Sequence, residues 1–131
     1  MKYLLDTAVF LWGLDEQHRL NTRAQEILQN RNEEIFVSPI VTWEIVIKHA
    51  RGKLKLARPT ADLVQRASTE FGAGSLPVTH LHSLALAELP PLHSDPFDRM
   101  LIAQARSENL VLMTADSLIR KYPVETLWCG K

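Results

Sequence analysis

The chain has 131 residues, which suits one domain with a single core, and 46% of its residues are hydrophobic. Its 15 basic and 15 acidic residues cancel, so net charge alone does not indicate a nucleic-acid partner. The single cysteine, Cys129, excludes an internal disulfide framework and is typical of a reducing compartment. No apolar run suits a signal peptide or approaches the ~20 residues of a membrane-spanning helix. We therefore expect one cytoplasmic domain, residues 1–131, with no membrane partner.

Short apolar runs alternate with amphipathic segments along the chain. The short runs are typical of buried parallel strands, and the longer segments have the apolar spacing of helices. Strands are predicted at residues 3–5, 35–37, 76–78, 111–113 and 124–128. Helices are predicted at residues 8–14, 21–29, 38–51, 60–71, 80–89, 95–109 and 117–122.

Local signals mark several of these boundaries. Ser38-Pro39 and Asp95-Pro96 each offer a capping side chain followed by proline at the first helical position. Thr60 is expected to cap the helix that Gly72 ends. Pro77 assigns the third strand to an edge of the sheet, because proline cannot donate a hydrogen bond to a neighbouring strand.

The alternation of strands and helices predicts an α/β fold, a parallel sheet of about five short strands flanked by helices in a three-layer sandwich. In such sheets, ligands bind beyond the carboxyl ends of the strands. Asp6 and Asp116 both follow predicted strands. They are therefore expected to be neighbours if their strands are.

Four carboxylates stand in segments that are otherwise apolar. Asp6 and Asp116 end predicted strands, whereas Glu44 and Asp98 interrupt apolar helical segments. An unpaired buried charge is expensive, so these acids need an explanation. A shared divalent cation with oxygen ligands would explain all four, and it would activate water for attack on a phosphodiester.

Each acid taken singly also has a structural explanation. Glu44 could pair with Lys48 four residues later, and Asp98 could interact with the dipole of its helix. Asp116 could cap the helix after it. Asp6 has no such role in the sequence, since the next helix is predicted to begin two residues later. Jointly, two strand ends and two inward helix faces favour a metal site.

Four motifs then resemble a known family. Leu5-Asp6-Thr7, Trp43-Glu44-Ile45, the segment from His93 to Ala105 and Thr114-Ala115-Asp116 are similar to motifs of PIN-domain ribonucleases. More narrowly, they resemble VapC-type toxins of bacterial toxin–antitoxin pairs. The similarity spans nearly the whole chain, and residues 95–105 are its most specific part.

The resemblance implies a PIN-like sandwich that cleaves RNA with Mg²⁺ or Mn²⁺, forms a homodimer and is inhibited by a small cognate antitoxin. It implies that four acids are catalytic and hold the metal, namely Asp6, Glu44, Asp98 and Asp116. It also implies that the Thr114 hydroxyl supports these acids and that Asp95 is an accessory acid. One departure is Ala8, where relatives often have histidine, and it leaves the acids intact.

A basic run between residues 48 and 58 contains no acid. Its members Lys48, Arg51, Lys53 and Lys55 could contact RNA phosphates, which dominate nucleic-acid affinity. Alternatively, they form a solvated helix end, because the dipole favours basic residues there.

The leading interpretation is a metal-dependent endoribonuclease. One alternative is a receiver-like phospho-acceptor domain, which has a similar length and α/β pattern. That domain needs an aspartate after its third strand, where this chain has Thr79-His80. A second alternative is an RNA-binding domain without catalysis, against which the intact acids argue.

Overall fold

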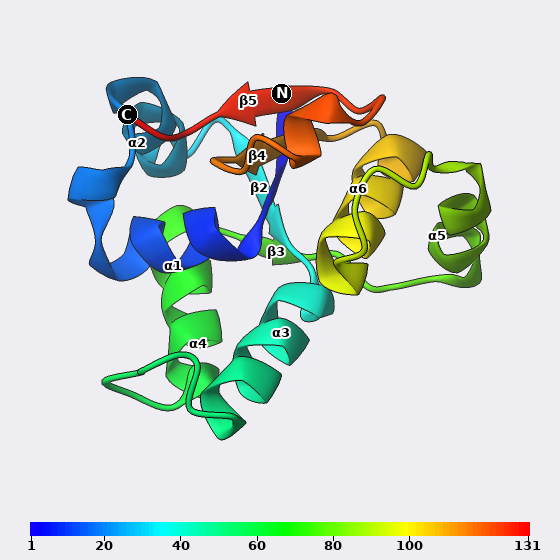
Figure 1. Cartoon of the computed structure of the whole chain (residues 1–131). Helices are drawn as coiled ribbons and strands as arrows, with labels where there is room; N and C mark the ends of the chain where they lie inside the picture. The colour runs from blue at the N-terminus through cyan, green and yellow to red at the C-terminus, as the bar shows by residue number, and fades with distance from the viewer.

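Five parallel strands form one sheet in the order β3-β2-β1-β4-β5 (Figure 1). The computed structural model describes residues 1–131. The predicted parallel sheet of about five short strands is confirmed. The strands are β1 (Lys2–Leu5), β2 (Glu34–Val37), β3 (Gly74–Ser75), β4 (Val111–Thr114) and β5 (Thr126–Trp128).

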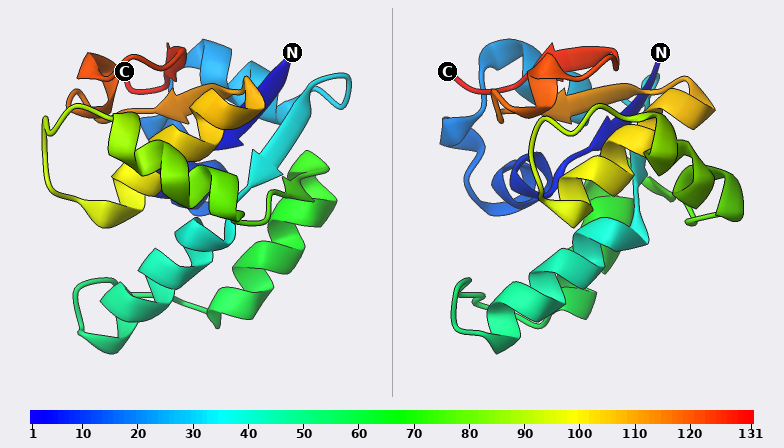
Figure 2. Two further views of the ribbon diagram at one scale, coloured as in Figure 1. Left: turned by 90° about the vertical axis from the view of Figure 1, so that its right-hand side faces the viewer. Right: turned by 45° about the vertical axis from the view of Figure 1, so that its right-hand side comes forward.

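Helices connect the strands and cover the sheet. In Figure 1, α1 and α6 lie on opposite sides of the central strands. Helices α3 and α4 pack together and project beyond the sheet in both views of Figure 2. None of the helices is both long and apolar enough to cross a lipid bilayer. The helices are α1 (Thr7–Asp15), α2 (Thr22–Gln29), α3 (Pro39–Ala50), α4 (Thr60–Phe71), α5 (His80–Ala85) and α6 (Pro96–Glu108), with 3₁₀ turns η1 (Gln17–Arg19), η2 (Leu86–Glu88) and η3 (Ile119–Lys121).

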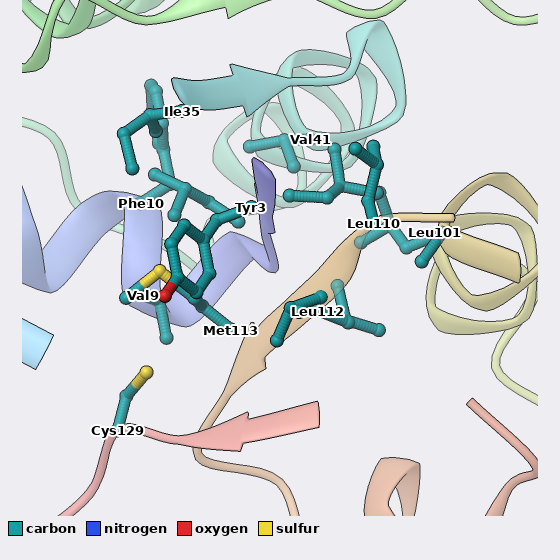
Figure 3. Close-up of a cluster of buried hydrophobic side chains, with 14 of the residues drawn as sticks. Tyr3, Val9, Phe10, Ile35, Val41, Leu101, Leu110, Leu112, Met113 and Cys129 are labelled. Atoms are coloured by element: carbon teal, nitrogen blue, oxygen red, sulfur yellow. The ribbon is translucent and has the colours of Figure 1, made fainter. Parts of the chain in front are cut away.

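The core lies around the two central strands, β1 and β4. Leu4 of β1 and Leu112 of β4 are fully buried, because helices cover both faces of the sheet. Phe10 of α1 and Leu101 of α6 add their side chains to the same cluster (Figure 3). This packing fixes the ends of β1 and β4 next to each other.

The strand order places a topological switch point between β1 and β4. The chain leaves β1 toward β2 on one side, whereas β4 and β5 lie on the other. Leu5 pairs with Met113, and the Asp6 N–H donates to the Met113 carbonyl over 3.0 Å. The carboxyl ends of the two strands are thus adjacent. This meets the condition under which Asp6 and Asp116 were expected to be neighbours. Ligands of open α/β sheets bind at such points.

The same strand order argues against the receiver-like alternative. Receiver domains have the order 2-1-3-4-5, with the third strand beside the first. Here β3 lies at the edge next to β2, and β1 pairs instead with β4. The receiver-like interpretation is therefore wrong at the level of topology.

The third strand is not the apolar run at residues 76–78. Gly74 pairs with Phe36 and Ser75 with Val37, and the Leu76 N–H donates the next hydrogen bond to the Val37 carbonyl. Pairing ends there, because β2 ends at Val37 and Ser38 already caps α3. The predicted edge position is confirmed, although the strand lies two residues earlier.

The other predicted helix boundaries are confirmed only in part. Ser38 and Asp95 cap α3 and α6 as predicted, and Gly72 ends α4 in the left-handed region at φ 65°. Thr60 does not cap α4, which it begins as the first helical residue after Pro59. The helix predicted at residues 117–122 is only the turn η3, and the one at 80–89 divides into α5 and η2.

Candidate active site

Asp6 joins the end of β1 to the start of α1. Its Oδ1 accepts the Val9 N–H over 2.8 Å as the N-cap of α1, so the expectation that Asp6 has no helix-start role is wrong. Its Oδ2 accepts the Thr114 hydroxyl over 2.6 Å. Burial raises the pKa of Asp6 to about 7; the charges of Asp98 and Asp116 add to the increase, and the two hydrogen bonds oppose it. Asp6 is thus a buried acid whose charged form is disfavoured by burial and, to a smaller extent, by the neighbouring acids.

Asp98 occupies the first turn of α6. Asp95 caps this helix, since its Oδ1 accepts the N–H groups of Phe97 and Asp98, and Pro96 fills the first helical position. Burial raises the pKa of Asp98 to about 6, and the charges of Asp95, Glu44 and Asp116 add to the increase. A hydrogen bond with His93 opposes it. Asp98 therefore lies within the electrostatic reach of three other carboxylates.

Glu44 is buried on α3, with only 4% of its surface exposed. Its Oε1 accepts the Thr7 hydroxyl from α1, and its Oε2 pairs with the Lys48 ammonium one turn later. The hydrogen bond to Glu44 is the largest cause of a raised Lys48 pKa. The pairing proposed as the structural explanation is present, yet Glu44 still acts on Asp98 through its charge.

Thr114 and Asp116 follow β4. The Thr114 hydroxyl is fully buried; it donates to Asp6 and accepts the Asp116 N–H over 3.0 Å. The Asp116 Oδ1 accepts the Leu118 N–H over 2.8 Å, which caps the turn before η3. Thr114 thus joins the ends of β1 and β4 and fixes the position of the Asp116 backbone.

These elements converge on an open hollow of about 520 Å³. Lys48 of α3, Asp98 of α6 and Asp116 lie on its wall. A separate hollow of about 280 Å³ between α1, α3 and α4 is lined without any ionisable side chain, so it offers no comparable chemistry. The lining of the first hollow is Lys48, His93, Ser94, Asp95, Pro96, Phe97, Asp98, Asp116 and Leu118.

The donors around this hollow suit a hard divalent cation, which binds carboxylate oxygens. The pKa values of Asp6 and Asp98 are both raised, chiefly by burial and further by the charges of neighbouring carboxylates, and a cation would relieve this penalty on their charged forms. No group of three or more His, Cys, Asp and Glu side chains is arranged to hold a metal as the side chains now stand. Each acid is instead engaged by the hydrogen bonds described above. The oxygen donors therefore fit the cation in kind.

The basic run does not form one surface. Lys48 lies at the acidic hollow, where its ammonium pairs with Glu44. Arg51 and Lys53 are exposed beyond the end of α3. Lys55 lines a different hollow, beside α1 and α4. Only Lys48 is therefore brought to the acids.

Sequence reasoning did not single out Thr7, His93 or Tyr122 as site residues. Thr7 contacts Glu44, and His93 contacts both Asp98 and Tyr122. The positions of Thr7 and His93 inside two of the recognised motifs were the available signal. Tyr122 had none, because it lies outside every motif.

The family model described as PIN domain matches residues 3–125 of the chain. The chain belongs to the PIN domain family. The resemblance inferred from its four motifs is thereby confirmed. No curated protein matches this PIN domain in sequence.

Solved structures share the fold of this PIN domain. VapBC2 from Rickettsia felis, bound to a DNA fragment from its promoter, gives a TM-score of 0.75 at 18% identity, over 99% of this chain and 100% of that one. DNA-bound VapBC from Salmonella typhimurium gives 0.69 at 16% identity over 97% of each chain. VapBC-1 from nontypeable Haemophilus influenzae gives 0.62 at 17% identity over 98% of each chain. The fold of VapBC structures is thus the fold of this chain.

Proposed function

We propose that this PIN domain is a Mg²⁺- or Mn²⁺-dependent endoribonuclease, the toxin of a toxin–antitoxin pair. The observation that carries the proposal is the convergence of acids on the switch point between β1 and β4. Burial first and neighbouring carboxylates second raise the pKa values of Asp6 and Asp98, and Asp98 and Asp116 line a hollow open to solvent. Nucleases of this kind need clustered carboxylates that phosphodiester oxygens can approach.

In this proposal Asp6, Glu44, Asp98 and Asp116 would hold the cation, with Asp95 as an accessory acid. A bound divalent cation supplies an activated water and stabilises charge on the phosphate. Thr114 keeps Asp6 oriented through its hydroxyl, and Asp95 fixes the first turn of α6 that carries Asp98. The Lys48 ammonium neutralises Glu44 and stands at the hollow, where it can meet a phosphate. Cleavage leaves a 5′-phosphate and a 3′-hydroxyl.

Lys48, Arg51, Lys53 and Lys55 are proposed to bind the RNA backbone. Lys48 lies at the acidic hollow, Arg51 and Lys53 would guide RNA that extends beyond the end of α3, and Lys55 would contact it farther along, beside α1 and α4. We also propose that residues 1–131 act as one PIN-like domain in the cytoplasm, consistent with one core cluster and a single buried free cysteine.

The partners follow from the family and its structural neighbours. Because VapBC assemblies share this fold, we propose that a small antitoxin protein binds and inhibits the chain, which itself forms a homodimer. Light scattering on the purified chain measures the dimer. Co-purification with a small protein encoded beside it, with loss of cleavage in the complex, measures the inhibition.

The test of catalysis is cleavage of structured RNA in Mn²⁺, with and without chelator. Asp6→Asn and Asp98→Asn keep the shape of each side chain and remove ligand charge, so activity should fall by about 10² or more at retained fold. Asp62→Asn, an exposed acid in the first turn of α4, is the matched control and should cleave normally. Undiminished cleavage by Asp98→Asn in saturating Mn²⁺ would refute the assignment, and RNA binding without cleavage by the wild type would favour the non-catalytic alternative.

A further inference from the structure

A chain of hydrogen bonds reaches Asp98 from three residues that the proposed function has not used. His93 Nε2 lies 3.2 Å from Asp98 Oδ2, and His93 Nδ1 lies 2.7 Å from the Tyr122 hydroxyl. Arg99 Nη1 donates to that hydroxyl over 3.0 Å and to the Pro90 carbonyl over 2.9 Å. Tyr122 is 3% exposed, and the His93 side chain is 12% exposed. Water therefore competes little for these groups.

The donors around Tyr122 decide which way its proton points. Its oxygen accepts an N–H from Arg99, which is always a donor, and the backbone N–H of His93 over 3.2 Å. With both acceptor positions taken, the hydroxyl proton must go to another acceptor. The choices are His93 Nδ1 at 2.7 Å and the His93 carbonyl at 3.5 Å. Because the shorter contact is much the stronger, Tyr122 donates to Nδ1.

The proton position on Tyr122 then decides the tautomer of His93. An Nδ1 that accepts a hydrogen bond carries no proton, so the neutral ring holds its proton on Nε2. That N–H points at Asp98 Oδ2. The opposite tautomer would turn a lone pair toward the carboxylate and leave the Tyr122 proton without its partner.

We propose that Arg99, Tyr122 and His93 are positioning residues, which hold Oδ2 of Asp98 and leave its Oδ1 free to bind the divalent cation. The inference rests on the proposed function, in which Asp98 is a ligand. Hydrogen bonds that orient a ligating carboxylate reduce the rotational freedom it must lose on binding, and their loss typically weakens metal affinity by about 10–100-fold.

A purely architectural role for Tyr122 makes a different prediction. Its hydroxyl also joins the segment at His93 to the region after η3, and loss of that link alone would lower stability. It would not change the tautomer of His93 or the metal affinity of the folded protein. These two quantities therefore separate positioning from architecture.

The test compares Tyr122→Phe with Tyr3→Phe. Both tyrosines are buried, but the Tyr3 hydroxyl hydrogen-bonds only to the Met1 sulfur, so it is a matched control. In ¹⁵N spectra of the metal-free protein, we expect His93 to show a protonated Nε2 and an unprotonated Nδ1 in the wild type and in Tyr3→Phe. In Tyr122→Phe the two tautomers should mix. By calorimetry, Tyr122→Phe should bind Mn²⁺ about tenfold more weakly, and Tyr3→Phe should match the wild type.

A second pair of variants covers the case in which Tyr122→Phe does not fold. His93→Gln retains an amide that can donate to Asp98, whereas His93→Leu retains none. Gln should therefore rescue most of the Mn²⁺ affinity that Leu loses. Equal affinity of these two variants would overturn the positioning role, as would a wild-type His93 protonated on Nδ1.

The outcomes separate this inference from the proposed function. Mn²⁺ affinity unchanged in Tyr122→Phe, with the wild type cleaving RNA, overturns the positioning role and leaves the nuclease standing. If the wild type and the variants bind Mn²⁺ with the expected order of affinities but the wild type cleaves no RNA, the positioning role is supported and the nuclease is refuted.

Discussion

Asp98→Asn should make the metal-free protein more stable while abolishing its activity. The pKa of Asp98 rises from 3.8 to about 6 on folding, chiefly because of burial and then because of Asp95. A rise of two pKa units corresponds to about 3 kcal/mol of free energy by which folding disfavours the charged form. Asparagine has no charge, so it removes this penalty.

The gain depends on pH in a direction fixed by the sign of the shift. Well below pH 3.8 the acid is protonated in both the folded and the unfolded chain, so the substitution gains nothing. As the pH rises from 3.8 to about 6 the unfolded chain loses its proton first, and the wild type loses stability relative to the variant. Well above pH 6 the difference is complete and constant.

One loss offsets part of the gain. The pKa of about 6 already includes the hydrogen bond from His93, so only the first-turn interaction with the helix dipole is lost in addition, about 0.3–1 kcal/mol. The net effect at pH 7.5 should be a stabilisation of about 2–3 kcal/mol. In a domain of this size, that raises the melting temperature by about 6–12 °C.

The assay is thermal unfolding by circular dichroism in chelator, from pH 4 to pH 8. Asp62→Asn is the control, since Asp62 is an exposed acid in the first turn of α4 and lies outside the acidic cluster in sequence. This variant should lose only the stabilising interaction with its helix dipole. If Asp98→Asn instead loses stability at pH 7.5 to the same extent as Asp62→Asn, Asp98 is a helix-start residue and the electrostatic argument for a clustered site is refuted.

Three further outcomes follow from the same structure. Mn²⁺ at a hundredfold excess over its dissociation constant should stabilise the wild type by about 2.7 kcal/mol in thermal melts; an equal gain in Asp98→Asn would mean that the ion binds elsewhere. Thr114→Val should lower the free energy of unfolding in urea at pH 8 by about 1–3 kcal/mol, because Asp6 and the Asp116 N–H lose a buried hydrogen-bond partner. The control Thr126→Val, at a half-buried position, should cost less, and equal losses would show that the Thr114 hydroxyl does not link Asp6 to Asp116. Lys53→Glu combined with Lys55→Glu should weaken RNA binding across sequences and flatten its salt dependence in fluorescence titrations, since fewer counterions are released; an unchanged salt slope would remove the basic run from the RNA interface.

Local signals in the sequence were enough to define most elements and their ends. Ser38 and Asp95 cap helices because each is followed by a proline that suits the first helical turn, and both were predicted correctly. The acids were found for a similarly local reason, since a charge within an apolar run is visible without any partner. The motif from His93 to Ala105 led to the family, which the match over residues 3–125 confirms.

The tertiary structure decided everything that depends on partners distant in the chain. The apolar run at residues 76–78 looked like a strand, but pairing with Phe36 and Val37 selects Gly74 and Ser75, because β2 ends at Val37. The order of the strands, and with it the adjacency of Asp6 to Thr114, comes from burying β1 and β4 between two helical layers. The link from Tyr122 through His93 to Asp98 joins residues up to 29 positions apart, and no periodicity or cap encodes such a contact. Sequence therefore determined which groups are present, and packing determined which of them meet.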